Sequence, residues 1–118
     1  MKLEEFETYN LAIDLGEKVH SSLNHWNYFD KDTIGKQLVR STDSIAANLS
    51  EGLGRYHFKE RRNFTYYARG SLYETRTWLL KSLHRKLISE IEYQHFISQL
   101  DKISVKLNNY VKTLKPKT

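Results

Sequence analysis

The sequence contains no cysteine and a single proline, Pro116, which lies in the C-terminal tail. Without cysteine, the chain forms no disulfide framework and offers no thiolate for a metal site or for nucleophilic catalysis. With proline confined to the tail, long uninterrupted helices are permitted elsewhere. No run approaches the roughly 18 apolar residues of a membrane span, and the start, MKLEEFETYN, has no apolar signal core. We therefore expect one cytoplasmic domain, residues 1–118, with no membrane contact.

The two halves of the chain differ in charge. Residues 1–54 carry 5 Lys/Arg and 9 Asp/Glu, a net charge of −4, whereas residues 55–118 carry 14 and 5, a net charge of +9. A basic half suits an anionic partner such as RNA or DNA. It equally suits the acidic half of a neighbouring copy of the same chain, and both interpretations stay open.

Apolar residues recur at helical spacing in four segments, and no stretch alternates with period two for long enough to be a strand. The connections between the segments are short, so consecutive helices are expected to lie antiparallel. We predict an all-α fold, an antiparallel up-down four-helix bundle. A basic tail, 115–118, is expected to fray. The predicted helices span approximately 6–23, 32–53, 58–86 and 90–114.

Local signals mark the ends of these helices. Asp30 or Asp32 is the predicted N-cap of the second helix, and Ser89 with Glu92 forms the S-x-x-E capping box that opens the fourth. The second helix ends at the glycines of the segment EGLGR, one of which is expected to adopt a left-handed cap.

The first two helices differ in the side chains of their expected buried faces. The expected buried face of the second helix is rich in small and polar residues. Small residues let the third helix approach closely. A buried Asn48 must then find hydrogen-bond partners, since an unpaired amide costs roughly 1–3 kcal/mol. The expected faces comprise Phe6, Tyr9, Ile13, Gly16, His20 and Leu23, with Ala12 and Val19 beside them, in the first helix, and Ile34, Leu38, Ser41, Ile45, Asn48, Leu49 and Gly52 in the second.

The third helix carries a stripe of cations interleaved with tyrosines. At about 100° per residue, these side chains fall within an arc of roughly 100°, broadly opposite the apolar face. Such a surface suits phosphates, with rings available for stacking on bases. The alternatives are an interface with an acidic neighbour or a plain solvated face, and Arg55 has a second possible place in the preceding hairpin. This basic stripe comprises Arg55, Lys59, Arg62, Tyr66, Arg69, Tyr73 and Arg76.

A set of polar and small residues lies along one side of the second helix and on the facing part of the third. A catalytic interpretation would need a nucleophile, a base and a third orienting group, and no such combination is evident. We therefore predict no catalytic residue and favour a structural network that sets the register between helices or subunits. This polar network comprises Arg40, Ser44, Asn48, Glu51, Gly52, Gly54, Gly70, Ser71 and Glu74.

Two Glu-x-x-His segments, Glu17/His20 and Glu92/His95, have the spacing found in di-metal carboxylate proteins. Such a site also needs a glutamate from each of the other two helices at the same end of the bundle. Residues 33–42 and 77–86, which would supply them, contain none. Glu92 is moreover committed to the helix cap, so we predict no metal and no cofactor.

The segment SIAANLSEGLGR, followed by RRNFTYYARGSLYET, resembles the four-helix-bundle family of the 23S rRNA intervening-sequence proteins. The family pattern is roughly R-x-x-x-S-I-x-x-N-I-A-E-G-x-G-R, then F-x-x-x-A-x-G-S-x-x-E. Leu49 and Ser50 replace the usual isoleucine and alanine, whereas the first and fourth helices match mainly in length and pattern. The matching residues are Arg40, Ser44, Ile45, Asn48, Glu51, Gly52, Gly54 and Arg55, then Phe64, Ala68, Gly70, Ser71 and Glu74.

The resemblance implies an up-down bundle that assembles as a five-fold ring, a homopentamer, and it implies little about activity. It also connects the chain distantly with the accessory proteins of diversity-generating retroelements, whose basic pentamers engage a reverse transcriptase and nucleic acid. That second connection is an analogy between folds, and a fold does not determine a function. We expect a non-enzymatic oligomer that contacts RNA or DNA through the basic stripe. The alternative is a protein-interaction scaffold without nucleic-acid binding, which uses the stripe in contacts between subunits or with another protein.

Overall fold

The computed structural model describes residues 1–116. The helices that open at Asn27 and Ser89 begin where a side chain accepts a hydrogen bond from a free backbone N–H group. Ser89 and Glu92 exchange the two hydrogen bonds of the predicted capping box, each 3.1 Å long. The second helical segment starts earlier than predicted, because the Asn27 side chain, rather than Asp30 or Asp32, accepts the capping hydrogen bond, from the Asp30 N–H at 2.9 Å. Residues 117–118 of the predicted frayed tail lie outside the described part.

The described residues form helices and no strand, which confirms the predicted all-α fold. A 3₁₀ turn, Leu3–Glu5, precedes the first long helix. A short helical turn, α2 (Tyr28–Asp30), and a π turn (Lys31–Gly35) lead directly into the second. None of the helices within residues 1–116 is both long and apolar enough to cross a membrane. The long helices are α1 (Glu7–Ser22), α3 (Lys36–Leu53), α4 (Phe58–His84) and α5 (Glu90–Val111).

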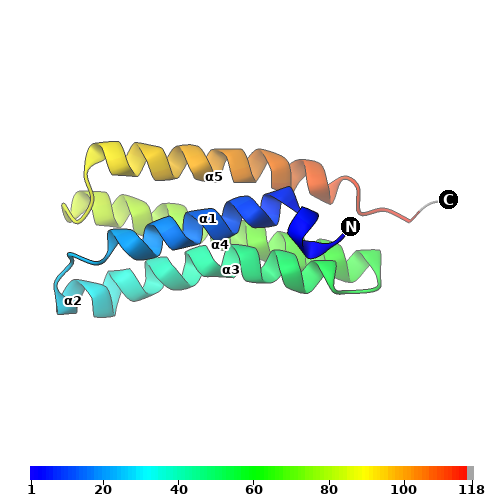
Figure 1. Ribbon diagram of the computed structural model, residues 1–118, viewed down its shortest axis with the longest axis horizontal. Coiled ribbons are helices and arrows are strands. Elements are labelled where there is room, and N and C mark those ends of the chain that lie inside the picture. Colours follow the sequence, from blue (N-terminus) through cyan, green and yellow to red (C-terminus); the bar gives the residue numbers. More distant parts are fainter. Residues whose placement is uncertain (117–118) are drawn as a thin grey trace.

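The long helices lie side by side along one axis of a rod that measures 53 × 23 × 22 Å, and the chain runs along them in alternating directions (Figure 1). In sequence order each long helix packs on the next, and α5 closes the bundle against α1. The α3–α4 pair has the most extensive contact and the α1–α5 pair the least. The π turn therefore lies at the end of the rod where α1 finishes and α5 begins.

Leucine, isoleucine and valine side chains from all four long helices form one core, including Leu15, Leu38, Leu72 and Leu100. The face predicted for the first helix was correct at most positions and wrong at two, because Ile13 is 42% exposed and His20 is also exposed. In their place α1 buries Thr8 and Leu15, together with the predicted Ala12, Gly16 and Val19. Apolar residues lie on more than one side of α1, so the spacing alone did not select the face that packs.

The α3–α4 seam contains the small residues that the sequence indicated. Ser41, Ile45, Leu49 and Gly52 are buried, whereas Asn48 is only half-buried. One hydrogen bond crosses the seam in its buried part, from the Thr75 hydroxyl to the Ser41 hydroxyl at 3.0 Å. Both hydroxyls also donate or accept locally, so neither is left unpaired in the core.

The turns differ from the predicted glycine caps. Gly54 follows the end of α3 with a φ of −75°, and no glycine of the described residues has a positive φ, so the predicted left-handed glycine cap was wrong. The left-handed conformation occurs instead at Lys86, where φ is 59°. There the N–H of Leu87 donates to the Ser82 carbonyl at 2.9 Å and the N–H of Lys86 to the Leu83 carbonyl at 3.0 Å, which is a Schellman motif.

Candidate nucleic-acid interface

The basic stripe occupies one flank of α4, which is 27 residues long and turns its opposite flank towards the core. Tyr66 and Tyr73 are 51% and 53% exposed. The guanidinium of Arg69 lies 5.7 Å from the centre of the Tyr73 ring, close enough for a cation–π contact. Lys59 and Arg62 stand earlier on the same flank, the first exposed and the second half-buried. The middle of α4 therefore presents cations and aromatic rings together.

Arg55, the first residue of the stripe, belongs to the α3–α4 hairpin. Its guanidinium bonds the Glu51 carboxylate at 2.6 Å and reaches that of Glu60 at 3.5 Å. It also lies 4.8 Å from the centre of the Phe64 ring. Because two carboxylates compensate its charge, Arg55 ties the hairpin together and adds little to the positive field of the stripe.

Arg76, at the other end of the stripe, is joined to α5. Its guanidinium donates to the Asp101 carboxylate at 2.5 Å, and its side chain is only 28% exposed. The contact shows that this flank of α4 lies beside α5. Among the five cations of the stripe, Lys59, Arg62 and Arg69 form no ion pair within residues 1–116.

Arg61 is a residue of this region that the sequence analysis did not single out. Its Nε donates to the Arg55 carbonyl at 2.5 Å, and its guanidinium lies 6.0 Å from the centre of the Phe58 ring. It also lowers the pKa of the Tyr110 phenol, which burial raises by a larger amount. The only local signal was the Arg-Arg doublet, which does not say which of the two points outward.

The polar network forms hydrogen bonds along α3 rather than between helices. The Ser44 hydroxyl donates to the Arg40 carbonyl at 2.8 Å, and the Asn48 amide donates to the Ser44 carbonyl at 2.9 Å. On α4, Glu74 accepts from the Trp78 indole N–H at 2.9 Å. Within the described residues, no side-chain hydrogen bond joins the α3 members to the α4 members. Register between the two helices is set by the hydrogen bond of Ser41 with Thr75, which lie outside the network, and by close packing at Gly52, which belongs to it.

Gly70, the α4 glycine of the polar network, is exposed, and a Cβ added there would meet nothing within 4 Å. It lies in the middle of a regular helix with a negative φ. A glycine inside a helix costs about 1 kcal/mol relative to alanine. Nothing within the protomer therefore accounts for a glycine at this position.

The structure brings three residues of the two Glu-x-x-His segments to one cavity and places the fourth, His20, elsewhere. Glu17, Glu92 and His95 line a cavity of about 570 Å³ between α1 and α5, whereas His20 lines another cavity, between α1 and α3. Within residues 1–116, no three His, Asp or Glu side chains are grouped closely enough to hold a metal ion. Glu92 accepts the capping hydrogen bond described above, so its carboxylate already has a partner.

Comparisons with known proteins place this geometry in a family. The 23S rRNA-intervening sequence protein family matches residues 4–109. A crystal structure from Bacteroides thetaiotaomicron, described as a protein of unknown function from the S23 ribosomal protein family, superposes with a TM-score of 0.80 over 89% of this chain and 98% of that one. The two sequences are 20% identical, so the likeness shows the shared fold alone. No curated protein sequence matches this chain. On the length of the family match, the chain belongs to the 23S rRNA-intervening sequence protein family.

Proposed function

We propose that the chain forms a cytoplasmic, non-enzymatic homo-oligomer, a pentameric ring, that contacts RNA or DNA through the basic stripe. The observation that carries the proposal is the row of cations without an ion-pair partner, Lys59, Arg62 and Arg69, alternating with exposed Tyr66 and Tyr73. Cations bind backbone phosphates, and exposed rings stack on unpaired bases. The family name connects this group of proteins with 23S rRNA, which agrees with a nucleic acid as the partner.

Two features support assembly. The acidic half of the sequence supplies α1 and α3, and the basic half supplies α4 and α5, so each protomer offers complementary surfaces to a second copy. The exposed helix-interior Gly70 is a second feature, because close approach by a helix of another protomer would account for the missing side chain.

Nucleic-acid contact is tested by fluorescence anisotropy with a labelled single-stranded RNA of mixed sequence, titrated at several salt concentrations. Binding through phosphates weakens steeply with salt, with a logarithmic slope of about −0.7 for each phosphate neutralised on a single strand. Arg62→Glu with Arg69→Glu is expected to abolish binding, because it removes two cations and introduces two carboxylates that repel the phosphates.

A matched control is Lys81→Glu with Lys102→Glu, which changes the net charge equally at exposed positions outside the stripe. This control is expected to weaken binding only modestly, through the long-range field. Binding that is independent of salt, or an equal loss in both double variants, would show that the stripe is not the contact surface.

The second candidate function is a protein-interaction scaffold without intrinsic nucleic-acid binding. It is favoured by the ends of the stripe, where Arg55 and Arg76 already pair with carboxylates of the same chain. Carboxylates of another protein would suit the remaining cations in the same way. The free cations would then pair with the acidic α1–α3 surface of a neighbouring protomer.

Light scattering on the same double variants separates the two functions. If the stripe is a subunit contact, Arg62→Glu with Arg69→Glu dissociates the oligomer, and the wild-type protein binds no RNA even at low salt. If it is the nucleic-acid surface, the variant keeps the wild-type mass and loses only RNA binding.

A further inference from the structure

A second basic region lies at the end of the bundle that is opposite to the α3–α4 hairpin. It is a cavity of about 470 Å³ between the last turns of α1 and the start of α3, a size typical of small-molecule sites. Its lining residues come from two segments separated by the connection through α2, so helical periodicity alone does not reveal it. They are His20, Leu23, Asn24, Lys31, Gly35, Lys36, Val39 and Arg40.

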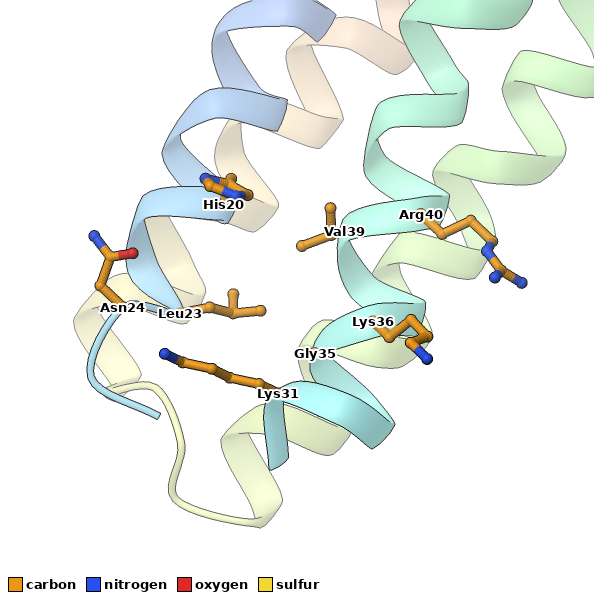
Figure 2. Close-up of a pocket in the computed structure, with 8 residues that line it drawn as sticks. All are labelled: His20, Leu23, Asn24, Lys31, Gly35, Lys36, Val39 and Arg40. Carbon is orange, nitrogen blue, oxygen red and sulfur yellow. The ribbon is translucent and has the colours of Figure 1, made fainter. Parts of the chain in front are cut away.

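The lining combines an apolar floor with a nitrogen-rich rim. In Figure 2, Leu23, Gly35 and Val39 lie in the middle of the view. His20 and Asn24 stand on the α1 side, and Lys31 extends across the gap towards α1. Lys36 and Arg40 project from α3 on the far side, with their charged ends turned outward from the gap. Among residues 1–116, no carboxylate lines this cavity.

The charges of the rim are only partly compensated. Lys36 pairs with Asp32 at 3.2 Å, whereas Lys31 and Arg40 form no ion pair in the described part of the chain. A phosphate monoester carries about −1.5 to −2 charges at neutral pH and three acceptor oxygens. Its charge matches the two unpaired cations, and exposed long side chains such as Arg40 change rotamer on the nanosecond timescale, which allows them to turn inward.

The floor is held in place by close packing rather than by flexible side chains. A Cβ added at Gly35 would stand 2.8 Å from a Leu23 methyl and 3.1 Å from the Asp30 carbonyl oxygen. Gly35 is the last residue of the π turn, and π turns within helices frequently mark functional sites. The turn therefore fixes the backbone of Gly35 beside the cavity before any ligand arrives, while the exposed Lys31 side chain at the other end of the turn stays free to reach it.

We propose that this cavity binds a small organic phosphate of mononucleotide size, separately from the basic stripe on α4. The phosphate is held by Lys31 and Arg40, and the sugar or base lies on Leu23, Val39 and the stem of Lys31. His20 and Asn24 donate to polar atoms at the edge of the ligand. No chemical step is assigned to the site.

Isothermal titration calorimetry with adenosine monophosphate, adenosine and inorganic phosphate tests the proposal on the full chain. Adenosine monophosphate is expected to bind at least tenfold more tightly than either fragment, because only the intact molecule uses both the floor and the rim. Lys31→Gln with Arg40→Gln is expected to weaken its binding at least tenfold while retaining RNA binding. Arg62→Glu with Arg69→Glu is expected to do the reverse, so this inference and the proposed function fail independently.

Equal affinities for the nucleotide and its fragments, or unchanged nucleotide affinity in the Lys31/Arg40 variant, would overturn the proposal. If that double variant does not fold, Lys31→Gln alone is combined with NMR of the methyl groups. Nucleotide-induced shifts centred on Leu23 and Val39 are expected, and shifts centred elsewhere contradict the assignment.

Discussion

The backbone of Gly52 in α3 lies directly against Phe64 in α4. A methyl group added to Gly52 would stand 2.9 Å from the Phe64 Cβ and 3.3 Å from the Arg61 carbonyl oxygen, and neither of these atoms is the end of a flexible side chain. This contact lets the two helices approach at the end of the bundle where the α3–α4 hairpin closes. It is the physical reason for the first glycine of the EGLGR segment.

Gly52→Ala is expected to lower the free energy of unfolding by about 1–3 kcal/mol, because the added methyl forces the helices apart. Chemical denaturation followed by circular dichroism measures the change. Gly54→Ala is the matched control, since a Cβ there would meet only the Glu51 carbonyl at 3.5 Å and the Ser50 carbonyl at 3.7 Å, and φ is negative. Equal losses in both variants would refute the close-contact explanation.

Gly70→Ala is expected to raise the free energy of unfolding of the protomer by about 0.5–1 kcal/mol, because alanine loses less backbone entropy in a helix. The position is open within the protomer, so the methyl meets no obstacle. Denaturation at several protein concentrations separates this gain from an effect on assembly. A loss of stability that grows as the protein is diluted would show that another chain approaches Gly70 closely.

Lys86→Gly is expected to stabilise the protein by about 0.5–1 kcal/mol, because Lys86 occupies the left-handed region at the end of α4 and glycine does so without steric cost. Thermal unfolding provides the measurement. Arg85→Gly, one residue earlier with a φ of −87°, is the control and is expected to destabilise. The opposite order of the two variants would contradict the Schellman geometry.

Asp43→Asn is expected to raise stability increasingly as pH rises above 3.8, the unperturbed pKa of an aspartate. Desolvation raises the pKa of Asp43, the nearby Glu17 raises it further, and His20 opposes the shift. Just above pH 3.8 the folded state therefore binds more protons than the unfolded state, so Asp43 reduces stability as pH rises through this window. The difference in unfolding free energy between variant and wild type, measured from pH 3 to neutrality, is predicted to grow and then level off.

The control for that experiment is Asp14→Asn, which removes a carboxylate that pairs with Lys18 at 3.0 Å across one helical turn. Loss of this exposed ion pair is expected to leave the free energy of unfolding unchanged or slightly lower. If Asp14→Asn reproduced the gain of Asp43→Asn, a general reduction of negative charge would account for both, and local desolvation would not.

The helices were predictable because their signals are local. The Ser89–Glu92 capping box depends on residues three apart, and it forms as predicted. The buried face predicted for α3 was largely correct, because its apolar residues lie on one side. In α1, Leu11, Ile13 and Leu15 alternate around the helix, so spacing alone wrongly placed Ile13 on the buried face and did not indicate Leu15. Contact with α3 and α5 decides that Leu15 is buried and Ile13 is not.

The sequence predicted which residues make up the candidate interface, but not which of its cations are paired with carboxylates. Spacing placed the basic stripe on one flank of α4, and it indicated that Arg55 had two possible places. Only the tertiary structure shows Arg55 held by Glu51 and Glu60, and Arg76 held by Asp101, which lies 25 residues away. Such pairs depend on the relative rotation of neighbouring helices, and residue spacing within one helix does not predict that rotation.

The amino-acid sequence by itself determined the class of fold, the helix-forming segments, the family and the row of cations on α4, because each is encoded within a turn or two of helix or in one continuous motif. The packed bundle decided which face of α1 is buried, which cations remain free, and which side chains meet across α1 and the start of α3 around Gly35. These outcomes depend on burial of the whole apolar surface at once, and on close contacts between residues far apart in the chain.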